Sequence, residues 1–167
     1  MNRSKAVAFT GVCTALALIL AYIEILIPPI FPAVPGIKMG LPNIIIVFLL
    51  YKRGPVSATA VSLLRIVLVS ILFGNAMAFI YSLAGSILSL LIMILLRKFN
   101  FFSAVGVSVA GAVAHNLGQT IMAILLLDTS EIAYYMVVLT ITGTIAGIFI
   151  GVCSSLLIKK FPIDFKD

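Results

Sequence analysis

Long apolar runs dominate this sequence and constrain its fold more than any other feature. The runs cover residues 6–27, 37–51, 56–73, 76–96, 102–127 and 131–158. Short breaks separate them; the first four contain proline, glycine or a basic pair, and the last begins with Asp128. Only 10% of the residues are charged, whereas a soluble domain has about 25%. The chain therefore lacks the polar side chains that would cover a water-exposed surface, and we predict an integral membrane protein.

The runs predict an all-α membrane protein, with one domain over residues 1–167 that forms a bundle of six transmembrane helices. Most runs approach the ~20 residues that an α-helix needs to cross a bilayer, and they lack the period-two alternation of a membrane β-barrel. Run 37–51 is short, so a re-entrant segment stays open there. Asp128 is expected to cap the last helix, with Glu131 completing a capping box.

The basic residues indicate the orientation of the bundle. All Lys and Arg residues except Lys38 and Arg65 lie near the two termini or in the breaks after the second and fourth runs. With an even number of spans, the positive-inside rule places both termini on the cytoplasmic side of the cell membrane. The net charge of +6 forms no continuous basic face, so we expect membrane lipid around the chain and no nucleic-acid partner.

Small residues indicate where helices touch. Gly143, Gly147 and Gly151 recur every four residues in the last run, which favours close helix packing inside the bundle. Ala17 and Ala21 form a similar pair in the first run. For this pair, internal packing and docking of a separate partner both stay open.

Arg65 is the most informative polar residue within the runs. It follows Pro55 by ten residues, which places it ~15 Å into the membrane at ~1.5 Å per residue. A permanently charged guanidinium at that depth needs an acid, carbonyl groups, water or an anionic ligand. Glu24 is the acid available within the runs, so a structural ion pair is the alternative to ligand contact.

A second polar group lies in the fifth run, where His115, Asn116 and Gln119 occur together with flanking glycines. We interpret this group as a cavity wall at which a ligand approaches the backbone. Hydrogen bonding between helices, worth about 1 kcal/mol per bond, is the alternative. The single histidine, with no cysteine at ligand spacing, argues against a metal site.

The segment from Pro35 to Asn43 is expected to form a loop over the outer mouth of the bundle. Lys38 in this loop either contacts a solute or extends towards the lipid headgroups. We predict a cavity open to the outside, with Arg65 at its floor, that binds a small anionic or strongly hydrogen-bonding solute. The predicted solute-binding residues are Glu24, Lys38, Asn43, Arg65, His115, Asn116 and Gln119.

Several motifs resemble the Gx transporter family, which is often labelled heptaprenyl diphosphate synthase component I. The motifs are PGIKMGLPN at 35–43, LLR at 63–65 with FG at 73–74, SLAG at 82–85, and VAGAVAHNLGQ at 109–119. Pro42 departs from the small residue that the family pattern has at this position. That family is similar to the substrate-binding S components of energy-coupling factor transporters, which are six-helix membrane proteins. The resemblance implies docking on a transmembrane coupling subunit with ATPases, and Ala17 and Ala21 match the docking positions.

We do not expect this chain to be an enzyme or to hold a cofactor. Prenyl diphosphate synthases hold magnesium and diphosphate with aspartate-rich motifs, but Asp128, Asp164 and Asp167 are dispersed and lie outside the spans. The chain also lacks a phosphate-binding Gly-x4-Gly-Lys-Ser/Thr loop. A solute-binding transport subunit is the leading hypothesis, and a non-catalytic membrane partner of a prenyl diphosphate or quinone-precursor enzyme is the alternative. A small channel has little support, because a lone arginine forms no selectivity ring.

Overall fold

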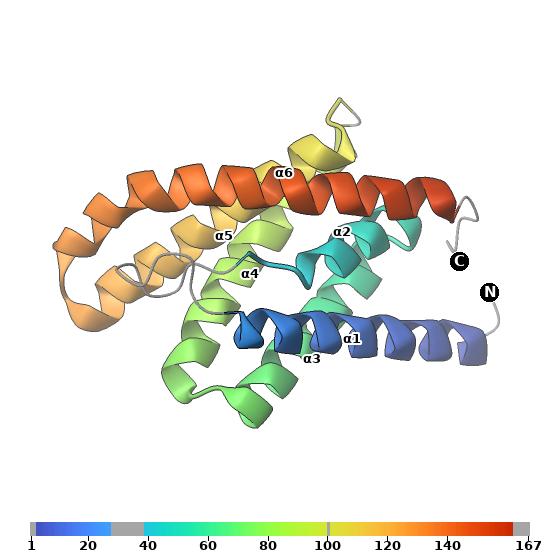
Figure 1. Ribbon diagram of the computed structural model, residues 1–167, viewed down its shortest axis with the longest axis horizontal. Coiled ribbons are helices and arrows are strands. Elements are labelled where there is room, and N and C mark those ends of the chain that lie inside the picture. Colours follow the sequence, from blue (N-terminus) through green and yellow to red (C-terminus); the bar gives the residue numbers. More distant parts are fainter. Residues whose placement is uncertain (1–2, 28–38, 100, 162–167) are drawn as a thin grey trace.

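The computed structural model describes residues 3–27, 39–99 and 101–161, which fold as a bundle of helices (Figure 1). The helices are α1 (Arg3–Leu26), α2 (Asn43–Lys52), α3 (Pro55–Phe73), α4 (Ala76–Lys98), α5 (Ala104–Leu127) and α6 (Met136–Lys160), and a 3-10 segment η1 (Ser130–Tyr135) precedes α6. No strand occurs within these described ranges. The predicted all-α fold with six helices is confirmed.

The helices differ in whether they can cross a membrane. Five are long and apolar enough to do so, namely α1, α3, α4, α5 and η1 with α6. Helix α2 has only 10 residues, or ~15 Å at ~1.5 Å per residue, which is about half the hydrocarbon core of a bilayer. It begins at Asn43, later than the expected start at 37, which lies outside the described residues. Six full spans therefore remain a prediction.

The distribution of side chains is the reverse of that in a soluble protein. Ile71 and Leu125 are 74% and 70% exposed, whereas Ser62 and Ser154 are 2% and 0% exposed. Exposed apolar side chains on every long helix would face water unfavourably, but lipid accommodates them. With the five long apolar helices, this surface identifies a multi-pass membrane protein.

The hydrophobic core surrounds α2. This helix is apolar on every side, which is typical of a buried helix, and its residues Ile45 to Leu50 are all buried. Residues of α1, α3, α4 and α5 pack around them, including Ala17, Val61 and Val107. One half of the bundle is therefore filled by a short central helix.

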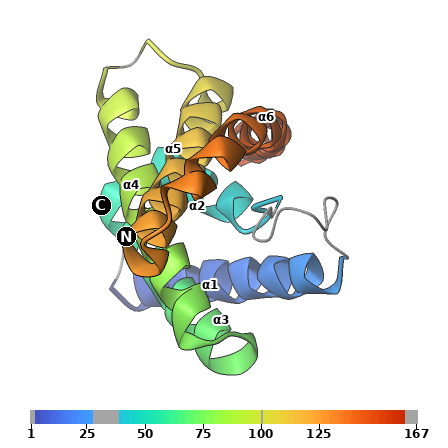
Figure 2. The same cartoon turned by 90° about the vertical axis from the view of Figure 1, so that its left-hand side faces the viewer.

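Glycines bring α5 and α6 together along one side of the bundle. A Cβ added at Gly147 or Gly151 would lie 2.7 Å from Val109 Cα or 2.6 Å from Val105 Cα. The two backbones are thus in direct contact, which confirms internal packing of the glycine stripe in α6. Figure 2 shows α6 nearly end-on while α1 runs across the view, so these two helices cross.

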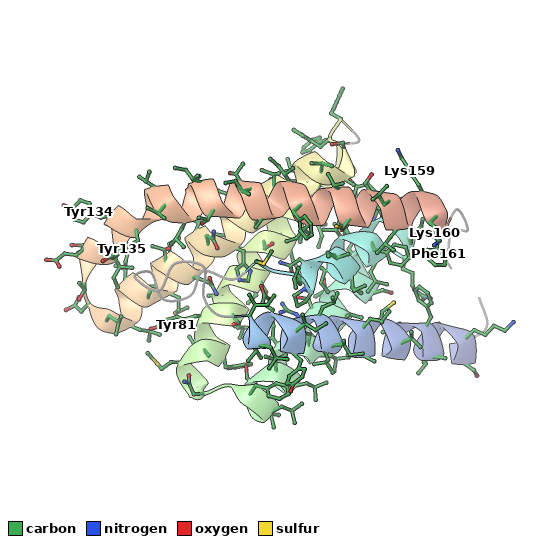
Figure 3. All side chains as sticks on the ribbon, viewed as in Figure 1. Tyr81, Tyr134, Tyr135, Lys159, Lys160 and Phe161 are labelled. Carbon is green, nitrogen blue, oxygen red and sulfur yellow. The ribbon has the colours of Figure 1, made fainter. Side chains whose placement is uncertain are left out.

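The two ends of the bundle have different side chains. The start of α1 and the end of α6 lie at the same end of the bundle (Figure 1). Figure 3 places Lys159 and Lys160 at this end and Tyr134 and Tyr135 at the opposite end of the η1–α6 segment. Basic residues and tyrosines both gather where helices leave the hydrocarbon core. The arrangement agrees with a membrane-spanning α6.

The start of the last helix differs from the prediction. Asp128 does not cap it. Asp128 ends α5 in a left-handed conformation with φ 49°, which aspartate tolerates better than most side chains. Glu131 lies in η1, and α6 begins at Met136. The predicted capping box is wrong because the chain reverses direction before it resumes a helix.

Candidate functional site

A cavity of about 90 Å³ lies beyond the amino-terminal end of α2. All six α-helices contribute to its wall. The polar lining consists of Glu24, Asn43, Arg65, Ser70, Ser82, His115, Asn116 and Gln119. The structure thus brings together every predicted solute-binding residue except Lys38, which lies outside the described residues.

The length of α2 explains why a cavity exists at this level. Helix α2 rises ~15 Å from its basic end, and Arg65 lies at the same ~15 Å from the start of α3. Beyond Asn43 no helix continues α2 through the described part of the chain. The space that the other half of a full second span would occupy is therefore lined by the surrounding helices.

Arg65 carries the most unusual polar atom of the cavity. Its Nε is buried and has no hydrogen-bond partner, although a buried donor without a partner is destabilising by about 1–3 kcal/mol. Native proteins retain few such groups, and a binding site is one place where they occur. The guanidinium of Arg65 is therefore incompletely satisfied by the protein.

Glu24 lies on the same cavity wall as Arg65 and acts on it electrostatically. The Glu24 carboxylate also accepts a hydrogen bond from the backbone N–H of Gly40, at the approach to α2. Glu24 thus fixes the segment before α2 and partly balances the charge of Arg65. The charge balance supports the ion-pair interpretation, whereas the unpartnered Nε supports ligand contact.

Gly85 on α4 makes room for His115 and Gln119. A Cβ at this glycine would lie 2.8 Å from both the His115 carbonyl oxygen and Gln119 Cγ, and 3.0 Å from His115 Nε2. The backbone of α4 therefore supports these two side chains from behind while they line the cavity. Their positions depend on tight packing between α4 and α5.

The glycines next to this polar group have a different role from the one predicted. A Cβ at Gly118 would lie 2.8 Å from the Ala84 carbonyl oxygen, and one at Gly111 would lie 2.6 Å from Met93 Cγ. Both glycines face α4 and allow two helices to approach. They pack helices and do not provide backbone surface for a ligand.

Asn116 is partly committed to helix packing. Its Nδ2 donates a 2.7 Å hydrogen bond to the Leu139 carbonyl oxygen of α6. A Cβ at Gly143 would lie 2.6 Å from the same nitrogen, so this glycine admits the amide. For Asn116 the interhelical hydrogen bond considered from the sequence is present, and the residue also lines the cavity.

The structure buries the predicted docking pair on α1. Ala17 is 0% exposed and Ala21 is 5% exposed; Ala17 belongs to the core around α2, and Ala21 lines the cavity. These side chains therefore pack inside the bundle in this structure, which favours the internal-packing alternative for the pair. The exposed face of α1 instead carries Gly11 and Ala15, and a Cβ at Gly11 would meet nothing within 4 Å.

Sequence reasoning missed Ser70 and Ser82 in the cavity wall. Serines are frequent in these apolar helices, and several of them pack helices, such as Ser62, Ser86 and Ser154. The signal for Ser82 was its place in the SLAG motif, which also contains Gly85. Within the described ranges, no group of three His, Cys, Asp or Glu residues could hold a metal ion.

Most of the chain matches a known protein family. The family model described as heptaprenyl diphosphate synthase component I matches residues 13–157, a stretch that contains the whole described wall of the cavity. The chain belongs to this family. The match confirms the family resemblance based on the motifs around Asn43, Arg65, Gly85 and His115. No curated protein and no solved structure matches the chain. Its function is therefore considered from the family and from the geometry of the cavity.

Proposed function

We propose that this member of the heptaprenyl diphosphate synthase component I family is the solute-binding membrane subunit of an uptake transporter. The cavity holds a small anionic or strongly hydrogen-bonding solute, and the described wall contains no second arginine or lysine. The buried Nε of Arg65, which lacks a protein partner, carries this proposal. A carboxylate or phosphate oxygen would satisfy that nitrogen in a charge-assisted bond.

The other polar groups would orient the solute. His115, Gln119 and Asn43 present imidazole and amide groups along one wall, and Glu24 would accept a hydrogen bond from a donor on the solute. Lys38 is proposed to contribute from the segment that precedes α2. Binding sites of this kind combine a few well-placed polar groups with an apolar wall, which Ile66, Val69 and Ile150 supply here.

Transport requires partners that supply energy. We propose that both termini face the cytoplasm in the cell membrane, that the cavity opens to the outside, and that the chain docks on a transmembrane coupling subunit with ATPases. Docking on α1 would use the exposed face with Gly11 and Ala15 rather than the buried pair. The chain itself would catalyse no reaction.

The family name favours a second candidate, because "component I" of a synthase implies a further protein component. In this alternative the chain is a non-catalytic membrane partner of a prenyl diphosphate or quinone-precursor enzyme. Purification of the chain from its native membrane in mild detergent separates the two candidates. Co-purified ATPase subunits support transport, and a co-purified soluble prenyl-transferring enzyme supports the alternative.

The binding proposal is tested by the small molecules that co-purify with the chain, identified by mass spectrometry. Arg65→Gln should release an anionic molecule that the unchanged chain retains. Arg65→Lys should retain less of it, because lysine lacks the planar two-pronged donor. Arg53→Gln is the matched control: Arg53 lies outside the cavity, where its Nε donates to Ser57 and its guanidinium stacks on Phe9.

An ion-pair role for Arg65 gives the opposite pattern. Arg65→Gln would then leave the Glu24 carboxylate buried without its balancing charge and lower the melting temperature. The double change with Glu24→Gln would restore the melting temperature. Such a rescue, with the co-purified molecule retained in all variants, would refute the ligand site.

A further inference from the structure

A groove of about 310 Å³ lies on the α3–α4 hairpin, close to its turn. Its lining consists of Val67, Ser70, Ile71, Asn75, Ala76 and Phe79. The only hydrogen-bonding side chains among them are Ser70 and Asn75, and the Asn75 side chain already accepts a hydrogen bond from the Ala78 N–H at 2.8 Å. The groove therefore offers an apolar surface along the hairpin.

The groove and the cavity adjoin each other. Ser70 lines both of them, and it follows Arg65 by five residues on the same helix, or ~7.5 Å along the axis at ~1.5 Å per residue. A molecule with its charged group at Arg65 would have to span this distance for its chain to reach the groove. The polar cavity and the apolar groove therefore meet at Ser70 on α3.

The sizes of the two spaces are complementary. The cavity of about 90 Å³ corresponds to roughly three water molecules at ~30 Å³ each, and the groove of about 310 Å³ corresponds to roughly ten. A charged head group fits the first space, and a single chain of about ten heavy atoms fits the second.

The position of the hairpin allows such a chain to enter from the membrane. Helix α4 packs mainly against α5 and much less against α3. The α3–α4 turn lies at the margin of the bundle in both views (Figures 1 and 2). The exposed side chains around it, including Ile71, Leu72 and Met77, would face lipid.

Building on the proposed function, we propose that the solute is an amphiphile with one anionic head and one apolar chain. The head binds Arg65 in the cavity, and the chain passes Ser70 and lies in the groove between α3 and α4. The head-group chemistry is a phosphate or carboxylate. The apolar tail distinguishes this class of solute from fully water-soluble anions.

The test uses decyl phosphate and inorganic phosphate as probes, with the purified chain in nanodiscs of neutral phosphatidylcholine. Decyl phosphate should bind at least tenfold more tightly than inorganic phosphate, after the signal from Arg65→Gln discs is subtracted to remove partition into lipid. A decyl phosphate with a diazirine in its chain should crosslink to residues 67–79, and Arg65→Gln should abolish these crosslinks.

A substitution that fills the groove separates the chain site from the head site. Ala76→Phe should weaken decyl phosphate binding at least tenfold and leave inorganic phosphate binding unchanged. Val137→Phe is the matched control, because Val137 is 68% exposed on α6 and lies outside both spaces. The control should change neither affinity.

Each outcome decides between the two proposals. Equal Arg65-dependent affinity for both probes would overturn the amphiphile and leave the proposed function intact. Loss of Arg65-dependent binding for both probes would overturn the two together. Displacement of decyl phosphate when the discs contain phosphatidylglycerol would identify a two-chain membrane lipid as the occupant and would overturn the single-chain solute.

Discussion

The two halves of this bundle differ in what fills their centre. At the end that holds the start of α1 and the end of α6, α2 occupies the middle, and Ile46, Leu49 and Leu50 are almost completely buried. At the other end the centre is a polar cavity lined by Arg65 and His115. The same helices surround both halves, so the difference arises from the length of α2. A ten-residue helix fills one half and leaves the other open.

Arginines show the same contrast. Near the filled half, Arg97 donates a 3.1 Å hydrogen bond to the Tyr51 carbonyl oxygen and lies over the Tyr51 ring. Arg53 bonds to Ser57 and lies over the Phe9 ring. In the hollow half, Arg65 keeps a buried nitrogen without a partner. Partners within the chain indicate a structural role for Arg97 and Arg53, whereas the unpartnered buried donor of Arg65 is the basis of the proposed ligand site.

The largest expected effect concerns which half faces outwards. After Cys13 and Cys153 are replaced by alanine, a cysteine at Thr129 should react in whole cells with a membrane-impermeant thiol reagent. A cysteine at Phe101, which is 91% exposed, should react only after the membrane is opened. Reaction of both from the same face would contradict the opposed ends and the even number of spans.

Shortening an apolar side chain should destabilise the protein more in the filled half than beside the cavity. Leu50→Ala should lower the free energy of unfolding in mixed micelles by about 2–5 kcal/mol, because the surrounding helices cannot close the void. Val69→Ala, at the cavity wall, should lower it by about 1 kcal/mol, since that side chain already borders open space. Equal losses would show that the cavity is closed in the membrane.

Gly85→Ala tests whether helix packing positions the cavity wall. The added methyl would meet the His115 carbonyl oxygen at 2.8 Å, so α4 and α5 must separate, at a cost of about 1–3 kcal/mol. Retention of the co-purified anion should fall as well, because His115 and Gln119 move. Gly11→Ala is the control, since a Cβ there meets nothing within 4 Å. If Gly85→Ala changes neither the stability nor the retention of the anion, α4 and α5 can move apart there at little cost.

The smallest expected effect belongs to Asn116. Removal of its hydrogen bond to Leu139 by Asn116→Ala should lower the free energy of unfolding by about 1 kcal/mol, as for other interhelical bonds in membranes. Thr142→Ala is the control, because Thr142 bonds within its own helix to the Val138 carbonyl oxygen at 2.9 Å. If retention of the anion falls without a loss of stability, Asn116 acts mainly on the solute.

The sequence alone determined the helical class, the family and most of the polar residues that line the cavity. Only α-helices and closed β-barrels satisfy the backbone polar groups in lipid, and runs that are continuously apolar lack the alternation of a barrel. Polar residues within these runs are few, so Arg65 and His115 could be selected as site residues before their positions were known. The depth of Arg65 followed from helix rise.

Only the tertiary structure decided how the helices are rotated and spaced relative to one another, because the sequence pattern does not specify these features. The exposure of Ala17 and Ala21 depends on how α1 rotates against α2 and α3, and the sequence shows small residues on more than one face. The end of α5 at Asp128 depends on how tightly the chain reverses before η1. The adjacency of cavity and groove at Ser70 depends on the spacing of α3 and α4. In each case the deciding quantity is a distance between helices, which results from packing of side chains that are far apart in the chain.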